Sequence, residues 1–390
     1  MPLTARGLTP VPLSLEDPRD ELVLVENAIV VPPPAESRTR QQKSGVLTAD
    51  GSFVENSISW GRSTDTVNAA PDMPDPDTIE DLPGTWMYAG IAYGHFGHFI
   101  VESMSRVWAM DELRGKIDGL IFTPKVIKPT ADRTVQVYEP MMRALGVDVP
   151  ARNTIVPLRV ERLYVPRQGF GMHDLIVGSE RFRNYMKAEA GKGIDPKGAE
   201  RIYISRTRLP ANRGGLLGES VLEALLAAEG YAMYHPQKET QVDQIAQYKA
   251  ARDIISVDCS PLHLVGYVGN ADQRIAILTR RSMDIARSMV NQLRTFNDSD
   301  AFEVNTLVRD WVPGKAHRAG RSSFGEIDFP RTYAALKAKG MIASETPWPA
   351  LTDEQRTADL ARIEELHGIK FNALEDTGQP LEDENSDASS

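Results

Sequence analysis

Residues 253–263 read Asp253-Ile254-Ile255-Ser256-Val257-Asp258-Cys259-Ser260-Pro261-Leu262-His263, where an apolar run stops and a helix is expected to begin. Ile254, Ile255 and Val257 are typical of a buried strand. Ser260 is a favourable N-cap, and Pro261 suits the first helical position, where its missing N–H is not needed. The free N–H groups and the dipole of such a helix start are suited to a phosphate. An ordinary strand–helix turn without a ligand has the same pattern, because every α/β domain contains several.

The alternation of strands and helices is regular on both sides of this stretch. Strands are expected at 202–204, 231–234 and 274–278, and helices at 219–229, at 240–251 and from 260 onward. Such a succession predicts a parallel sheet with right-handed crossovers, and ligands of these sheets bind at the carboxyl ends of the strands. The loop after the first strand carries Arg206 and Arg213. They are either fork-shaped phosphate donors or solubilising loop charges.

A second informative stretch, residues 93–108, combines a glycine-containing turn with the start of a predicted helix. At about 100° per residue, His98, Glu102 and Arg106 fall within a sector of about 80°, while apolar residues gather on another face. We expect these three ionisable groups to point outward, with His95 beside them in the turn. The face is then either a catalytic site or a solvated row of i,i+4 ion pairs.

Composition limits the classes of function. The 390 residues suffice for two domains, and the net charge of -10, with no basic cluster interleaved with aromatics, argues against nucleic-acid binding. Cys259 is the only cysteine, which excludes an internal disulfide and a cysteine-built metal site. No run approaches the ~18 apolar residues of a membrane span, and residues 1–20 carry no apolar signal region. We therefore expect a reducing, cytoplasmic location.

Changes in pattern along the chain predict five segments. Residues 21–25 and 28–31 are strand-like, Asp50-Gly51 is a hairpin signal, and residues 375–390 contain six acids and no base. The predicted segments are a β-rich N-terminal extension with a linker (1–84), a first α/β domain (85–198), a second α/β domain (199–285), a mainly helical segment (286–372) and a disordered acidic tail (373–390).

Three features in this order resemble glycosyltransferase family 61. They are His98-x-x-x-Glu102-x-x-x-Arg106 after the Gly-rich turn, Tyr203-Ile204-Ser205-Arg206, and residues 253–263 after a helix that contains Gln244. The resemblance covers roughly residues 85 to 280, and the β-rich opening looks like bacterial members, which include capsular polysaccharide enzymes. The family also includes plant xylan-decorating transferases and eukaryotic O-GlcNAc transferases of the secretory pathway.

The sequence departs from the family pattern at two places. His95 stands where an asparagine is usual, and residues 257–260 replace the family's Gly-Pro-His-Gly turn, so that its histidine is missing. Some relatives instead carry a Ser-containing turn followed by Leu-His, which residues 260–263 resemble. The phosphate-binding role is therefore expected to rest on different side chains.

The resemblance implies a fold and an activity. The fold is α/β with two Rossmann-like domains of the B-type glycosyltransferase architecture, flanked by the β-rich extension and the helical C-terminal segment. The acceptor-side domain is expected at 85–198 and the nucleotide-sugar domain at 199–285. The activity is inverting transfer of a sugar from a nucleotide-sugar donor to a hydroxyl of a glycan or lipid-linked glycan, in cell-surface or capsular polysaccharide synthesis. We expect no metal or other cofactor, and a location in the cytoplasm or at the cytoplasmic face of the inner membrane.

Inversion requires a base on the acceptor hydroxyl and stabilisation of the departing diphosphate. Either His98 or Glu102 is the candidate base. The candidate substrate-binding residues are His95 and Arg106 near that base and, for the diphosphate or the ribose, Arg206, Arg213, Ser260 and His263.

Three other interpretations stay open. A metal-dependent transferase would hold its ion on Asp75-Pro76-Asp77 or Asp298-Ser299-Asp300, which have Asp-x-Asp spacing. A hydrolase would use Cys259 and His263 as nucleophile and base. A third possibility is a sugar-binding relative of the same fold without catalytic activity.

Overall fold

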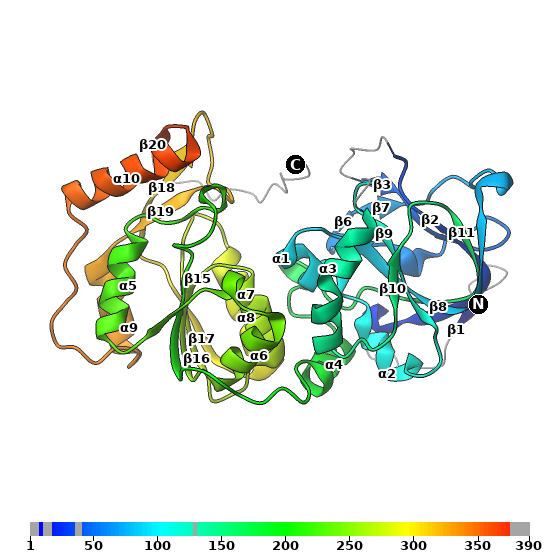
Figure 1. Ribbon diagram of the computed structural model, residues 1–390, viewed down its shortest axis with the longest axis horizontal. Coiled ribbons are helices and arrows are strands. Elements are labelled where there is room, and N and C mark those ends of the chain that lie inside the picture. Colours follow the sequence, from blue (N-terminus) through cyan, green and yellow to red (C-terminus); the bar gives the residue numbers. More distant parts are fainter. Residues whose placement is uncertain (1–7, 11–17, 36–40, 128–130, 375–390) are drawn as a thin grey trace. The chain divides into compact units, whose positions relative to one another are not determined.

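The computed structural model describes residues 8–10, 18–35, 41–127 and 131–374 (Figure 1). This part of the chain divides into two compact units at residues 193 and 194, close to the boundary expected at 198 and 199. The acidic tail predicted from residue 373 lies outside the described residues from 375 onward. The mixture of helices with parallel strands confirms the α/β class.

A seven-stranded mixed sheet forms the centre of the first unit, in the order β1-β2-β11-β8-β9-β10 with β4 paired to β2. The strands β11, β8, β9 and β10 are mutually parallel, whereas β2 is antiparallel to β11. Small two-stranded sheets are formed by β3 with β7 and by β5 with β6. The bounds are β1 Leu8–Pro10, β2 Leu22–Val31, β3 Gln42–Lys43, β4 Gly45–Leu47, β5 Trp60–Arg62, β6 Asp65–Thr66, β7 Asn68–Ala69, β8 Glu80–Ala92, β9 Gly119–Pro124, β10 Ala151–Asn153 and β11 Leu158–Pro166.

Of the strands before β8, β1, β2 and β4 belong to this central sheet, whereas β3, β5, β6 and β7 form the two small sheets. Strand β2 pairs with β11 along most of its length, from Leu22 opposite Pro166 to Val30 opposite Leu158. The boundary expected at residue 84 falls inside β8. Both faces of β2 carry buried residues, which is characteristic of a strand inside a sheet. The hairpin predicted at Asp50-Gly51 is confirmed, since the Val54 N–H donates to the Val46 carbonyl at 2.9 Å.

Short helices and turns connect these strands. Residues 99–103 form a π-helical turn, and the other turns of the first unit are 3₁₀ helices. The bounds are α1 Phe96–His98, α2 Met110–Leu113, α3 Ala131–Ala144 and α4 Glu180–Glu189, with the turns η1 Pro18–Asp20, η2 Glu55–Ser57, η3 Pro76–Thr78, η4 Phe99–Ser103, η5 Val107–Ala109 and η6 His173–Leu175.

The second unit is built on a five-stranded parallel sheet in the order β14-β12-β15-β16-β17. The four strands predicted from the sequence are confirmed, and β17 adds a fifth. Helices α5 and α9 cover one face, while α6, α7 and α8 cover the other (Figure 1). The strand order reverses between β12 and β15, because β12 connects through α5 to one side and β15 through α7 to the other. Such a reversal opens a crevice at the carboxyl ends of the two strands.

The remaining strands of the second unit form a four-stranded sheet in the order β13-β19-β18-β20. The segment 286–372, predicted as mainly helical, contains three helices and also four strands among the described residues. The strands are β12 Arg201–Ile204, β13 Gly215–Leu216, β14 Ala232–Tyr234, β15 Asp253–Val257, β16 Arg274–Leu278, β17 Asp300–Val304, β18 Leu307–Pro313, β19 Phe324–Ile327 and β20 Phe371–Ala373. The helices are α5 Glu219–Ala228, α6 Gln241–Ala250, α7 Pro261–Val268, α8 Ile285–Asn297, α9 Phe329–Ala338 and α10 Asp353–His367, with the turns η7 Ala211–Arg213 and η8 Pro236–Lys238.

Side chains cap two helix starts of the second unit, but not the start at Ser260. The Thr240 side chain accepts from the Asp243 N–H at 3.1 Å, and Thr352 with Gln355 forms a capping box at the start of α10. Pro261 is the first residue of α7, but Ser260 has helical backbone angles and makes no side-chain capping bond. Because a capping side chain requires a non-helical N-cap, the cap predicted for Ser260 is wrong.

We predict that Gly90→Ala lowers the free energy of unfolding by about 1–3 kcal/mol, because Gly90 in β8 has φ +95°. A Cβ there would also lie 2.4 Å from Nη1 of the buried Arg106. Urea denaturation monitored by circular dichroism measures the loss. Gly115→Ala is the control, since Gly115 has φ +73° and a Cβ there meets no described atom within 4 Å. Equal losses in the two variants would show that crowding against Arg106 contributes nothing.

Candidate functional site

In the first unit, the candidate residues follow the carboxyl end of β8. The turn at residues 93–95 is held by two hydrogen bonds, from the Tyr93 N–H to Ser103 Oγ at 2.9 Å and from Tyr138 Oη to the Gly94 carbonyl at 3.0 Å. His95 is the N-cap of α1, and the π-helical turn η4 continues the chain. The turn and the helix start therefore give the side chains that follow a defined position.

The π-helical turn changes which residues share a face. The Met104 N–H donates to the Phe99 carbonyl at 3.1 Å, an i to i+5 bond that places more residues in the turn than an α-helix does. The spacing of about 100° per residue therefore no longer relates Arg106 to His98 and Glu102. The prediction that all three residues point outward is wrong for Arg106, which is 0% exposed.

Arg106 instead connects this segment to the rest of the first unit. Its Nε donates to the Pro166 carbonyl at 3.0 Å and its Nη2 to the Ile58 carbonyl at 2.6 Å. A third bond runs from Nη1 to Ser59 Oγ at 3.3 Å. Burial lowers the pKa of Arg106 to about 10. The contacts describe a buried cation held by neutral oxygen atoms, which is a structural role.

His98 and Glu102 form a hydrogen-bonded pair, as their i,i+4 spacing predicts. Nδ1 of His98 bonds Oε2 of Glu102, and the two side chains are 43% and 10% exposed. The His98 ring stacks on Tyr93 with a centroid separation of 5.4 Å, and the His95 ring meets it edge-on at 5.8 Å. With Nδ1 committed to the carboxylate, the other ring nitrogen, Nε2, is the one that can take a proton from a substrate.

The charges around His98 favour its protonated form. Burial lowers its pKa, but the hydrogen bond and the charge of Glu102 together outweigh burial, so the pKa lies above its ordinary value. Lys125 opposes this rise, and its own pKa is lowered by burial despite the charge of Glu102. Lys125 follows β9, the strand beside β8. The sequence analysis missed it, although its place shortly after the apolar run at residues 120–122 was a usable signal.

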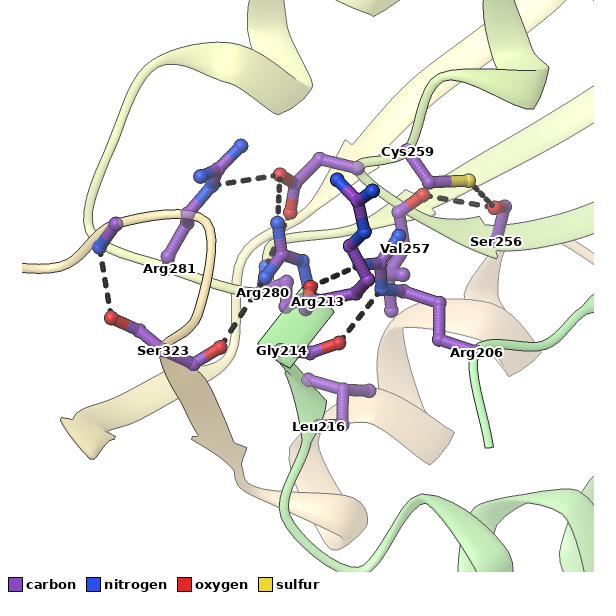
Figure 2. Close-up of polar contacts among 12 residues, drawn as sticks. Arg206, Arg213, Gly214, Leu216, Ser256, Val257, Cys259, Arg280, Arg281 and Ser323 are labelled. Carbon is purple, nitrogen blue, oxygen red and sulfur yellow. Dashed lines mark hydrogen bonds and ion pairs between the residues drawn. The ribbon is translucent and has the colours of Figure 1, made fainter. Parts of the chain in front are cut away.

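In the second unit, the candidate residues lie after the neighbouring strands β12 and β15. Arg206 donates from Nε to the Gly214 carbonyl at 3.1 Å and from Nη2 to the Arg213 carbonyl (Figure 2). The structure therefore brings Arg206 and Arg213 together, but through the Arg213 backbone. Burial and the nearby Arg280 lower the pKa of Arg206. The Arg206 side chain shapes the loop that leads to β13.

Two arginines that the sequence analysis missed lie at the same edge of the sheet. Asp258, 2% exposed, accepts from Arg280 Nη2 at 3.3 Å and from Arg281 Nε at 3.1 Å. It also accepts from the Arg280 backbone N–H at 3.1 Å. Figure 2 labels both arginines. Both arginines follow β16, the strand beside β15. Their position after a predicted strand was the signal that could have identified them.

Ser260 is partly exposed at the start of α7, whereas His263 is buried. The N–H of Leu262 donates to the Cys259 carbonyl and that of His263 to the Ser260 carbonyl, each at 3.1 Å, so a tight first turn already uses these donors. His263 is 3% exposed, and its Nδ1 lies 2.6 Å from Oε1 of Gln292 on α8. The ring of His263 therefore takes part in packing α7 against α8.

The structure gives the Asp-x-Asp segments local roles. Asp75 accepts from the Asp77 N–H at 3.0 Å and caps η3. Asp298 ends α8 in a left-handed conformation, and Asp300 begins β17 at the amino end of the strand, opposite to the carboxyl edge. Within the described ranges, no three His, Cys, Asp or Glu side chains are grouped as a metal site would require. Likewise, no helix in the described part of the chain has the length and apolar character to cross a membrane.

The environment of Cys259 differs from that of a catalytic thiol. The residue is 5% exposed, and its Sγ lies 3.2 Å from Ser256 Oγ. Burial raises the pKa of the thiol, whereas a nucleophilic cysteine needs a lowered pKa. Cys259 is therefore poorly suited to be the nucleophile that the hydrolase interpretation requires.

Comparison with known proteins agrees with the resemblance seen in the sequence. Residues 96–270 match the sequence model of the family described as Glycosyltransferase 61. The matched region is a little under half of the 390 residues, and it includes the His98–Glu102 pair and the turn after β15. No curated protein matches the chain significantly. The match supports this family, and with it a glycosyltransferase in general, without distinguishing the bacterial capsular type from other members.

We predict that iodoacetamide alkylates Cys259 much more slowly in the folded protein than in urea, because the thiol is buried and its pKa is raised. Mass spectrometry of timed samples at pH 7 measures both rates. As Cys259 is the only cysteine, each modified molecule reports on this position. Rapid alkylation of the folded protein together with loss of activity would restore the hydrolase interpretation.

Proposed function

We propose that the protein is an inverting glycosyltransferase of family 61. It transfers a sugar from a nucleotide-sugar donor to a hydroxyl of a glycan or lipid-linked glycan acceptor. The observation that carries the proposal is the His98–Glu102 pair, which lies in the region matched by the family and combines a half-exposed imidazole with a nearly buried carboxylate. A role in capsule synthesis, a cytoplasmic location and two Rossmann-like domains of the B-type architecture stay predictions.

His98 is the general base in this proposal. Its Nε2 takes the proton of the acceptor hydroxyl as the hydroxyl oxygen attacks the anomeric carbon, and Glu102 stabilises the imidazolium that forms. The bond from the anomeric carbon to the diphosphate breaks on the opposite face of the sugar, and its electron pair leaves with the diphosphate. Glu102 is 10% exposed and already bonded to Nδ1, so it is suited to orient the imidazole.

The second unit holds the donor in this proposal. A diphosphate leaving group needs positive charge and N–H donors that are in place before the bond breaks. The guanidinium of Arg206 has five N–H donors, and its bonds to Arg213 and Gly214 use two of them. The start of α7 after β15 adds the positive end of a helix dipole.

We predict that His98→Ala and Glu102→Gln each lower turnover roughly 100-fold or more, with little change in donor affinity. The deprotonated imidazole is the active form, so kcat/KM should fall as the pH drops through the raised pKa of His98, above the ordinary value of about 6.5. Glu102→Gln removes the charge that raises this pKa, so the acidic limb should move to lower pH. Rates of transfer measured across the pH range test both statements.

A matched control for these variants is Glu139→Gln. Glu139 forms an i,i+4 ion pair with Arg143 on α3, and its side chain is 53% exposed. We expect its replacement to leave both the rate and the pH profile unchanged. Near-normal turnover in His98→Ala and Glu102→Gln would mean that their pair is an ordinary helix ion pair, and would favour a non-catalytic sugar-binding relative.

We predict that sugar transfer continues in excess EDTA. The guanidinium groups and the helix start supply the charge that a divalent ion provides in metal-dependent transferases. Transfer rates measured with EDTA, and again after addition of Mn²⁺, test this. Loss of activity on chelation and its recovery with Mn²⁺ would make the Asp-x-Asp interpretation the better one.

A further inference from the structure

We propose that Arg280 and Arg281 complete the diphosphate site, forming with Arg206 a cluster of three guanidiniums that binds the donor's diphosphate and stabilises it as it leaves. This inference rests on the proposed function. Arg280 and Arg281 lie beyond residues 96–270, the region matched by the family. The cluster therefore adds residues to the site that the match does not cover.

The topology brings the three arginines to one edge of the sheet. Strands β12, β15 and β16 are neighbours and parallel, with Ile204 opposite Ser256 and Ser256 opposite Ile277. Arg206 follows the end of β12, and Arg280 follows the end of β16. Between them, Asp258 follows β15. The carboxyl ends of parallel strands are where such sheets bind their ligands.

The described residues provide too few negative charges and hydrogen-bond acceptors for the three arginines of the cluster. Among the described residues, Asp258 is the single carboxylate that forms an ion pair with any of the three arginines. Arg280 is 3% exposed, and one further bond runs from its Nη1 to the Ser323 carbonyl at 3.3 Å. Its Nε is buried and has no acceptor among the described residues. A buried N–H without a partner calls for an acceptor such as a phosphate oxygen.

Repulsion among the guanidiniums also favours an anion at this site. Burial, and after it the charge of Arg280, lowers the pKa of Arg206, and the same two causes lower that of Arg281 to about 10. Two further carboxyls face the cluster, but burial raises the pKa of both Glu219 and Asp310. Glu219 is bonded to the backbone N–H of Arg206, and Asp310 to that of Ser282. An added dianion would relieve the repulsion among the arginines.

A purely structural role is the competing explanation. Arg280 bonds the Ser323 carbonyl next to β19, so the arginines also connect the five-stranded sheet to the four-stranded one. A structural tie predicts a loss of stability on substitution without a change in anion affinity. The proposed site predicts a loss of affinity in the molecules that remain folded.

The test is isothermal titration calorimetry on the full chain with inorganic pyrophosphate and with ADP, CDP, GDP and UDP. Arg281→Gln is the principal variant, because the Arg281 side chain is 14% exposed and its loss disturbs packing less than that of Arg280. Arg287→Gln on α8 is the control, with a side chain 68% exposed. Arg281→Lys keeps the charge but loses the planar fork. Melting temperatures of all variants are measured in parallel.

We expect Arg281→Gln to weaken pyrophosphate and the preferred nucleoside diphosphate roughly 10-fold or more, with Arg281→Lys intermediate and Arg287→Gln unchanged. The corresponding free nucleoside should bind the wild type and Arg281→Gln equally. Unchanged affinity in Arg281→Gln, or a reduced number of binding sites at unchanged affinity, would overturn the inference and leave the proposed function standing. Failure of the wild type to bind pyrophosphate and all four nucleotides would overturn both.

Discussion

Both groups of candidate residues depend on one constraint, that parallel strands end together at one edge of a sheet. In the first unit, the ends of β8 and β9 place the turn before His98 and the side chain of Lys125 near each other. In the second unit, the ends of β12, β15 and β16 gather Arg206, Asp258 and Arg280. Because the strands are mostly apolar and buried, their hydrophobic packing determines where these polar groups lie.

The hydrogen-bond donors of buried arginines find different kinds of acceptor in the two units. Arg106 donates to several carbonyl and hydroxyl oxygens and keeps no polar atom buried without a partner among the described residues. Arg280 shares one carboxylate with Arg281 and has an Nε without an acceptor in that part of the chain. Hydrogen bonding to neutral oxygens is sufficient for a structural cation, whereas a buried donor without a partner beside further cations supports the proposed diphosphate site.

The features that were predicted correctly from the sequence are those that a local pattern of residues determines. The strand at 253–257, the helix start at Thr240 and the hairpin at Asp50-Gly51 follow from periodicity, capping and turn chemistry over a few residues. Pairings between distant segments could not be read this way, among them β2 with β11 and β13 with β19. The π-helical turn was not predicted either, because the periodicity argument assumed a regular α-helix. That assumption led to the wrong prediction that Arg106 points outward.

The sequence left the choice between His98 and Glu102 as the base open, and the structure supplies an argument for His98. A base must reach the acceptor hydroxyl, and the side chain of His98 is 43% exposed whereas that of Glu102 is 10% exposed. The carboxylate bonds Nδ1, which fixes the ring and leaves Nε2 for the substrate. If the roles were exchanged, the substrate would have to reach a carboxylate that is nearly buried and already bonds the imidazole through Oε2. With His98 as base, the more exposed group meets the substrate, and the charge of the carboxylate stabilises the imidazolium formed during transfer.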